Sequence, residues 1–153
     1  ADKTQARALM RAGNLISRPS QGRLNLFFYD PKFKKTLPYY DTFPLVLPLE
    51  PIPGGFIGMN FHYLPPAMRF TLLARMDKFL SGDMIRPNTK YQVSYDSVKN
   101  IPMVKPTLHK YLYSNVRSQF LRINASEAAV AVYLPVQQFR KQPATTVWRR
   151  STR

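Results

Sequence analysis

The residues with the clearest chemical character form a short cluster in which lysines surround an aromatic ring. Residues 32–35 are Lys-Phe-Lys-Lys, and two adjacent tyrosines, Tyr39 and Tyr40, follow shortly after. Ammonium groups attract phosphates, and aromatic rings stack on nucleobases or on cations. The cluster therefore suits a nucleic acid or a protein partner. In the alternative interpretation, its rings only anchor a proline-rich loop to the core.

Positive charge dominates the rest of the chain as well. The 153 residues include 23 lysines and arginines against 8 acids, a formal net charge of +15. Residues 1–25 carry five basic side chains and one acid, and residues 138–153 carry five basic side chains and no acid. We call these two ends the basic arms. Such a chain seeks anionic partners, either nucleic acid or acidic protein surfaces.

Two interpretations of the basic arms remain open: they grip phosphates or an acidic partner, or they are solvated tails that aid solubility. We favour the first. The expected partner- or phosphate-contacting residues are Arg7, Arg11, Arg18, Arg23, Lys32, Lys34, Lys35, Arg140, Lys141, Arg149, Arg150 and Arg153, with Tyr39, Tyr40 and Trp148 as interface anchors.

Catalytic chemistry is poorly supported. Cysteine is absent, and the two histidines, His62 and His109, have no acidic neighbour close in sequence. None of the phosphate-loop, dinucleotide, nucleophile-elbow or zinc-protease patterns occurs. We therefore expect no enzyme activity, no metal, no cofactor and no small-molecule substrate.

His62 follows a run of apolar and aromatic residues and precedes Pro65-Pro66. It is either a functional histidine in an aromatic pocket or a hydrogen-bonded histidine that closes a strand, and we favour the second. His109 is expected on a helix face, solvated or facing an interface.

The elements that would position these residues indicate an α+β fold. Leu24 to Tyr29 and Phe56 to Phe61 are predicted strands, and Phe43 to Leu49, interrupted by prolines, is predicted as an edge or irregular strand. Three extended segments joined tightly suggest a small, curled antiparallel sheet, with a barrel-like closure as one option.

Two or three helices are expected after this sheet, and one short helix before it. Thr4 to Met10 favours a short basic helix, and Ala67 to Leu80 a helix that begins at Pro65-Pro66 and places Arg69 off its apolar face. Tyr91 to Tyr95 is a candidate strand. Apolar residues at every fourth position predict a helix from Pro106 to Phe120, and Asn124 to Glu127 resembles a capping box before a helix over Ala128 to Tyr133.

Length and hydropathy indicate one domain, over residues 24–139, with a basic N-terminal arm over 1–23 and a basic C-terminal tail over 140–153. The chain has no apolar run of the length that a membrane span needs. We therefore expect no membrane partner.

Several segments resemble one protein family. They are Phe28 to Lys32, Thr36 to Val46, Gly55 to Pro66, Ser94 to Asp96 and Lys110 to Phe120. The resemblance covers about residues 24 to 139. The family is a small one from T-even-like myoviruses, common in cyanophages, whose members are labelled DNA end protector or uncharacterised virion protein. The resemblance implies a virion component and carries no catalytic motif.

Three functions remain. The first is a structural subunit of a contractile-tailed phage virion, in the tail, baseplate or neck, held by other virion proteins with acidic or apolar surfaces through its arms and proline-rich segments. The second is a virion protein that binds and protects the end of the packaged DNA. The third, a ribosomal or other RNA-assembly protein, fits the charge but not the resemblance. DNA-end binding predicts that the arms converge on one groove.

Overall fold

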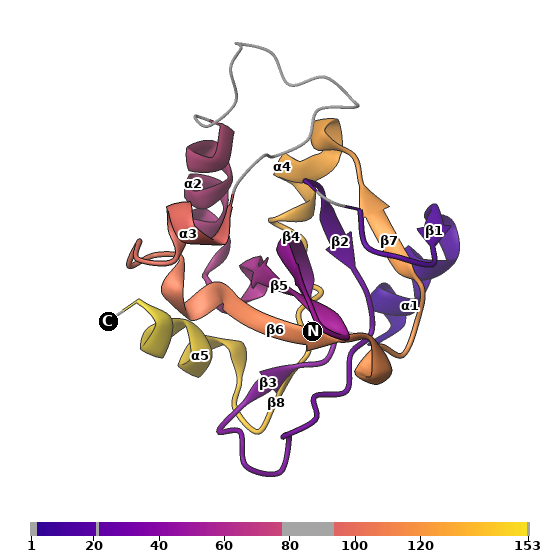
Figure 1. The fold of residues 1–153 in the computed structure, drawn as a ribbon, viewed down its shortest axis with the longest axis horizontal. Helices are drawn as coiled ribbons and strands as arrows, with labels where there is room; N and C mark the ends of the chain where they lie inside the picture. Colours follow the sequence, from indigo (N-terminus) through magenta and orange to yellow (C-terminus); the bar gives the residue numbers. More distant parts are fainter. Residues whose placement is uncertain (1–2, 21, 78–93, 153) are drawn as a thin grey trace.

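The computed structural model describes residues 3–20, 22–77 and 94–152, and an antiparallel six-stranded sheet forms its centre (Figure 1). The strands are β1 (Leu15–Ile16), β2 (Leu24–Leu26), β4 (Leu45–Ile52), β5 (Gly55–Asn60), β6 (Leu108–Leu112) and β7 (Phe120–Ile123). Their order across the sheet is β1-β7-β2-β4-β5-β6. Two short strands, β3 (Tyr40–Asp41) and β8 (Phe139–Arg140), pair separately. The sheet is curled but not closed as a barrel.

Helices complete the α+β fold that the sequence predicts. The α-helices are α1 (Lys3–Ala12), α2 (Pro66–Asp77), α3 (Tyr95–Val98), α4 (Ala128–Ala131) and α5 (Ala144–Ser151). The 3-10 helices are η1 (Phe61–Tyr63), η2 (Lys105–Thr107), η3 (Tyr113–Asn115) and η4 (Ala125–Glu127). No helix within the described ranges is long and apolar enough to cross a membrane.

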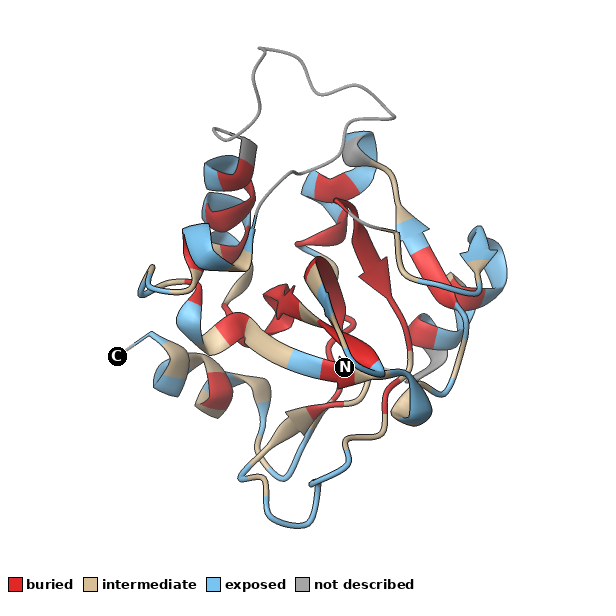
Figure 2. Ribbon diagram, in the orientation of Figure 1, coloured by how far each residue is buried: buried red, intermediate tan, exposed pale blue. Residues whose placement is uncertain are grey.

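The sheet buries side chains on both faces, because alternate residues of a strand point to opposite sides. On β4, Leu45 and Leu47 join the main core with α2, whereas Val46 joins a second cluster. This second cluster is mostly aromatic and contains Phe27, Tyr29, Val46, Phe56, Tyr111 and Phe120. Figure 2 shows that β2, β4 and β5 are mostly buried, whereas residues 32–36, in the loop between β2 and β3, are exposed.

The sequence predicts that the proline-containing strand is an edge or irregular strand. In the structure this strand, β4, is not a simple edge strand. β4 lies between β2 and β5, but β2 pairs only with Leu45 and Val46. Pro48 and Pro51 lie beyond that pairing, next to β5 alone, and the register shifts between Pro48 and Glu50. Proline has no backbone N–H to donate to a neighbouring strand. The segment with Pro48 and Pro51 therefore suits a position with a neighbour on one side only.

The helix predicted from Pro106 to Phe120 is wrong. The segment forms η2, β6, η3 and the start of β7. A spacing of four residues fits one face of a strand as well as one face of a helix, since four is a multiple of two. As a result, His109 lies on β6 and not on a helix.

The other helix predictions agree better with the structure. α1 covers its predicted segment, α2 covers its own as far as Asp77, where the described residues end, and α4 begins at Ala128 as predicted but ends at Ala131 and not at Tyr133. The end of the second predicted helix, at Ser81-Gly82, and residues 91–93 of the candidate strand lie outside the described residues. Tyr95, the last residue of that candidate strand, begins α3.

Both basic ends pack against the domain. α1 buries Ala6 and Met10 in the main core, and β1 pairs with β7. At the other end, β8 pairs with β3, and α5 buries Val147. Arg7, Arg11, Arg140, Arg149 and Arg150 therefore lie on helices or strands, whereas Arg18, Arg23 and Lys141 lie in bends.

Candidate nucleic-acid interface

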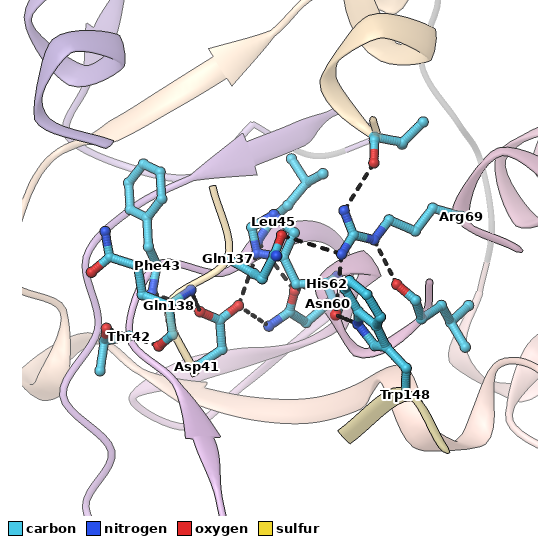
Figure 3. Close-up of polar contacts among 12 residues, drawn as sticks. Asp41, Thr42, Phe43, Leu45, Asn60, His62, Arg69, Gln137, Gln138 and Trp148 are labelled. Carbon is cyan, nitrogen blue, oxygen red and sulfur yellow. Dashed lines mark hydrogen bonds and ion pairs between the residues drawn. The ribbon is translucent and has the colours of Figure 1, made fainter. Parts of the chain in front are cut away.

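A buried carboxylate organises the centre of the interface. Asp41, on β3, is 3% exposed and accepts four hydrogen bonds (Figure 3). Its Oδ1 accepts from the backbone N–H groups of Phe43 and Gln138, each at 3.0 Å. Its Oδ2 accepts from Nδ2 of Asn60 at 3.1 Å and from Nδ1 of His62 at 2.9 Å. These bonds fasten β3 to the end of β5 and to the chain just before β8.

The ionisation states of this pair follow from its surroundings. Burial alone would raise the pKa of Asp41, but its interactions with His62 and with the other donors outweigh burial and hold that pKa below the ordinary value. Burial lowers the pKa of His62, and the neighbouring Asp41 offsets this only in part. His62 is therefore a neutral ring that donates from Nδ1. This agrees with the hydrogen-bonded interpretation of His62 and not with an accessible functional histidine.

Arg69, on α2, continues the network and has no exposed surface. Its guanidinium donates to the backbone carbonyls of Leu64 at 2.6 Å, Val132 at 3.0 Å and His62 at 3.4 Å. Burial lowers the pKa of Arg69 to about 10, so it remains charged at neutral pH. This role does not follow from the sequence, in which Arg69 lies off the apolar face of the predicted helix.

Trp148, the single tryptophan, connects α5 to the same network. Its Nε1 donates to the carbonyl of His62 at 2.9 Å, and its ring lies 5.4 Å from the guanidinium of Arg69. Trp148 was expected to anchor the chain to a partner. In the structure it anchors α5 to the domain.

An aromatic cavity of about 320 Å³ lies beside Asp41. We call it the tyrosine pocket. Its aromatic lining residues are Tyr29, Phe33, Tyr40, Tyr63, His109 and Tyr111. Asp41 and Asn60 also line it, and Lys32 and Lys110 are exposed lining residues at its margin.

The rings of the tyrosine pocket come from segments that are far apart in the sequence. Tyr29 follows β2, Tyr40 lies on β3, Tyr63 ends η1, and Tyr111 lies on β6. Tyr29 and Tyr111 pack edge to face with ring centroids 5.0 Å apart. Tyr63 lies against His109, with centroids 4.3 Å apart. The lining is therefore assembled only by the tertiary fold.

Phe33 belongs to the loop that closes one side of this pocket. The backbone N–H groups of Thr36 and Leu37 both donate to the carbonyl of Phe33, which folds the loop into turns. From beyond β8, Nζ of Lys141 donates to the carbonyls of Lys35 at 3.2 Å and Leu37 at 2.7 Å. The Phe33 ring is 63% exposed, so a partner can reach it.

A second hollow, of about 450 Å³, lies on the other side of Tyr29, which lines both cavities. We call it the arginine hollow. Arg7, Arg117 and Arg140 line it, from α1, from the segment before β7 and from β8. Their side chains reach one surface region although the three residues are widely separated in the sequence.

Two further groups shape the charge of the arginine hollow. Asp30 lies 3.8 Å from Arg117 and 2.9 Å from Lys34. Gln138 is 5% exposed, and its amide Nε2 is buried with no hydrogen-bond partner among the described residues. The hollow thus combines three guanidinium groups and one unused amide donor with a single carboxylate.

The remaining predicted contact residues are dispersed. Arg11, Lys35 and Arg149 are exposed, Arg18 lies over the ring of Tyr113, and Arg150 lies over that of Tyr39. Arg23 is buried, and it hydrogen-bonds the side chain of Asn124. Arg153 lies outside the described residues. The structure therefore brings Arg7 and Arg140 together, and Lys32 with Tyr40, but not the whole predicted set.

Arg117 is not among the contact residues expected from the sequence, because no motif surrounds it. Its place in the arginine hollow depends on the chain between β6 and β7, where its N–H donates to the carbonyl of Phe28 at 2.8 Å. No local pattern of residues could have revealed this. Within the described ranges, no group of three or more histidines, cysteines or acids could hold a metal ion.

Comparison with known proteins identifies a family. No curated protein and no solved structure matches the chain. A family model, however, matches residues 4–151, which include most of both basic arms and every residue of the two cavities. Its description is Phage T4 terminal DNA protecting protein. The chain therefore belongs to the family of the phage T4 terminal DNA protecting protein.

Proposed function

We propose that this chain is a non-enzymatic phage protein that binds and protects the end of the packaged DNA in the virion. The family supports this DNA-end hypothesis better than the tail, baseplate or neck subunit that we placed first from the sequence. The observation that carries the proposal is the convergence of Arg7, Arg117 and Arg140 on one hollow.

The arginine hollow has the chemistry of a phosphate site. Guanidinium groups bind phosphate oxygens through paired N–H donors, and they remain charged at any physiological pH. Because contacts to phosphate oxygens carry no information on the bases, such binding is independent of sequence, as an end-binding protein requires.

A non-enzymatic role fits the state of the buried polar groups. The carboxylate of Asp41 already accepts four hydrogen bonds, and His62 has no exposed surface. Neither group is placed to exchange protons with a substrate. Their arrangement serves to hold β3, β5 and α5 together.

The first experiment measures DNA binding across a salt series, with a blunt-ended linear duplex and a closed circle of the same sequence. The proposal predicts tighter binding to the linear duplex. Neutralising three phosphates gives a slope of log K against log salt of about −2.7. Equal binding to both DNAs would contradict the proposal.

A matched pair of variants tests the arginine hollow itself. Replacing Arg7, Arg117 and Arg140 together by alanine should abolish most of the salt-dependent binding. Replacing Arg11, Arg75 and Arg149 removes the same charge from exposed positions that do not line the hollow. If the two triple variants lose affinity equally, binding is diffuse and the hollow is not the site.

A second function, attachment to other virion proteins, is supported by one exposed aromatic pair. Phe70 on α2 and Tyr133 after α4 stack with ring centroids 5.7 Å apart, although 42% and 50% of their surfaces are exposed. Exposed aromatic rings are common at protein interfaces. Replacing both by serine should reduce incorporation into virions without changing DNA binding by the purified protein.

A further inference from the structure

We propose that the tyrosine pocket binds the terminal nucleobase of a DNA strand while the arginine hollow holds the phosphates behind it. This inference deepens the proposed function and rests on it. The two cavities share Tyr29 as a lining residue, so one strand can reach both.

The size and lining of the tyrosine pocket suit a base. Its volume of about 320 Å³ lies within the range of about 300–1,000 Å³ typical of small-molecule sites. Aromatic rings form most of the lining, and every base has a flat face that stacks on such rings. The exposed ring of Phe33 offers a stacking surface at the mouth.

The polar groups in the pocket favour binding without sequence preference. Oδ1 of Asn60 accepts from the N–H groups of Leu45 and His62, and its Nδ2 donates to Asp41. The edges of Asn60 and Asp41 are therefore already engaged and cannot read the edge of a base. A protein that acts at a DNA end of any sequence needs this kind of pocket.

Apart from Asp41, whose carboxylate oxygens are already hydrogen-bonded, the pocket walls are neutral, and the positive charge lies at the margin. Burial lowers the pKa of His109 to about 4, and burial raises the pKa of Tyr63 and of Tyr111. Lys32 and Lys110 are exposed and form no ion pair with a described carboxylate. An uncharged base inside the pocket and phosphates at its margin match this distribution. An acidic side chain of a protein partner inside the pocket would not.

This arrangement explains a preference for ends. A base inside a duplex is stacked on both faces and paired, so its extraction costs free energy. A terminal base has one free face and opens more easily. The pocket therefore selects an end by the ease of opening rather than by sequence.

The test uses photo-crosslinking to identify what contacts the terminal base. A linear duplex carries 5-iododeoxyuridine either at the strand terminus or at an interior position, and crosslinked peptides are mapped by mass spectrometry. We expect the terminal label to crosslink to Phe33, Tyr40 or another ring of the pocket, and the interior label not to. Terminal crosslinks that map outside the pocket would overturn the inference.

Variants supply a second readout. Phe33→Ala with Tyr40→Ala should lower the terminal crosslink yield by about tenfold or more, from the loss of stacking. Phe70→Ala with Tyr133→Ala removes two exposed rings elsewhere and should leave the yield unchanged; circular dichroism confirms folding. A wild-type protein with no preference for ends would overturn both the proposed function and the inference. A preference for ends that the pocket variants retain would overturn the inference alone.

Discussion

The ring of His62 and the carboxylate of Asp41 form a fully buried pair, with Nδ1 of the ring 2.9 Å from Oδ2. The pair joins residues on β3 and η1 that are 21 positions apart in the sequence. Because Asp41 also lines the tyrosine pocket, the stability of the interface depends on this buried pair.

Replacing Asp41 by Asn should destabilise the protein by about 3 kcal/mol. The amide keeps one acceptor oxygen, and its buried NH2 group then faces N–H groups that donated to the second carboxylate oxygen. Urea unfolding followed by circular dichroism measures the change. The control is Asp96→Asn, which removes an exposed carboxylate paired with Lys99 and should cost less than about 1 kcal/mol. Equal losses for the two variants would contradict a structural role for Asp41.

Stability should decline as the pH falls from 6.5, the ordinary histidine pKa, toward 4. Burial lowers the pKa of His62, and it lowers the pKa of His109 to about 4. The unfolded chain therefore binds protons more readily over this range, which favours unfolding. The contribution of Asp41, whose pKa lies below its ordinary 3.8, is present above that value and is lost only at lower pH. His109→Gln should make the decline between pH 6.5 and 4 less steep; an unchanged slope would contradict the assignment.

Replacing Trp148 by Phe should cost about 1 kcal/mol, since it removes one hydrogen bond to the carbonyl of His62 and keeps most of the ring contact. Hydrogen exchange should show faster opening of α5 in the variant. Tyr133→Phe, at an exposed position, serves as the control and should leave exchange in α5 unchanged.

Glycine is required at two neighbouring positions for different reasons. A Cβ at Gly55 would overlap the backbone carbonyl of Tyr111, so Gly55→Ala should separate β5 from β6 and prevent stable folding. Gly54 has φ +74° and open space around it, so Gly54→Ala should cost only about 1–2 kcal/mol of backbone strain. Thermal unfolding of both variants tests the order of these effects.

Replacing Asp30 by Asn should strengthen DNA binding. Asp30 lies near Arg117 and Lys34 and offsets the positive charge of the arginine hollow. Its removal should raise affinity by about two- to fivefold at low salt, the range expected for an exposed ion pair. Asp96→Asn changes the net charge equally at a distant site. A gain of the same size in that control would mean that net charge alone sets the affinity.

The sequence predicts the parts of this fold whose signals are local. Turn residues and apolar runs locate β2 and β5, and Pro65-Pro66 locates the start of α2. The helix expected over residues 106–120 fails because its apolar spacing also suits a strand, and pairing with β5 decides between the two. Strand pairing between distant segments has no local signal.

The candidate site was predictable only in part for the same reason. Charge and aromatic content predict Lys32 and Tyr40 as contact residues, and they predict Arg7 and Arg140 individually. They do not reveal that Arg117 lines the same hollow as Arg7 and Arg140. Nor could they show that Arg69 is buried, because its acceptor on Val132 is 63 residues away.

The pairing of β2 with β7 and of β3 with β8 has a consequence for synthesis of the protein. The N-terminal strands leave the ribosome long before their partners exist, so the nascent chain cannot complete its sheet. Arg7 and Arg140 likewise meet only after the chain has been made as far as residue 140. A shorter nascent chain thus exposes its positive charge without a formed hollow, and under the proposed function it should not yet recognise a DNA end.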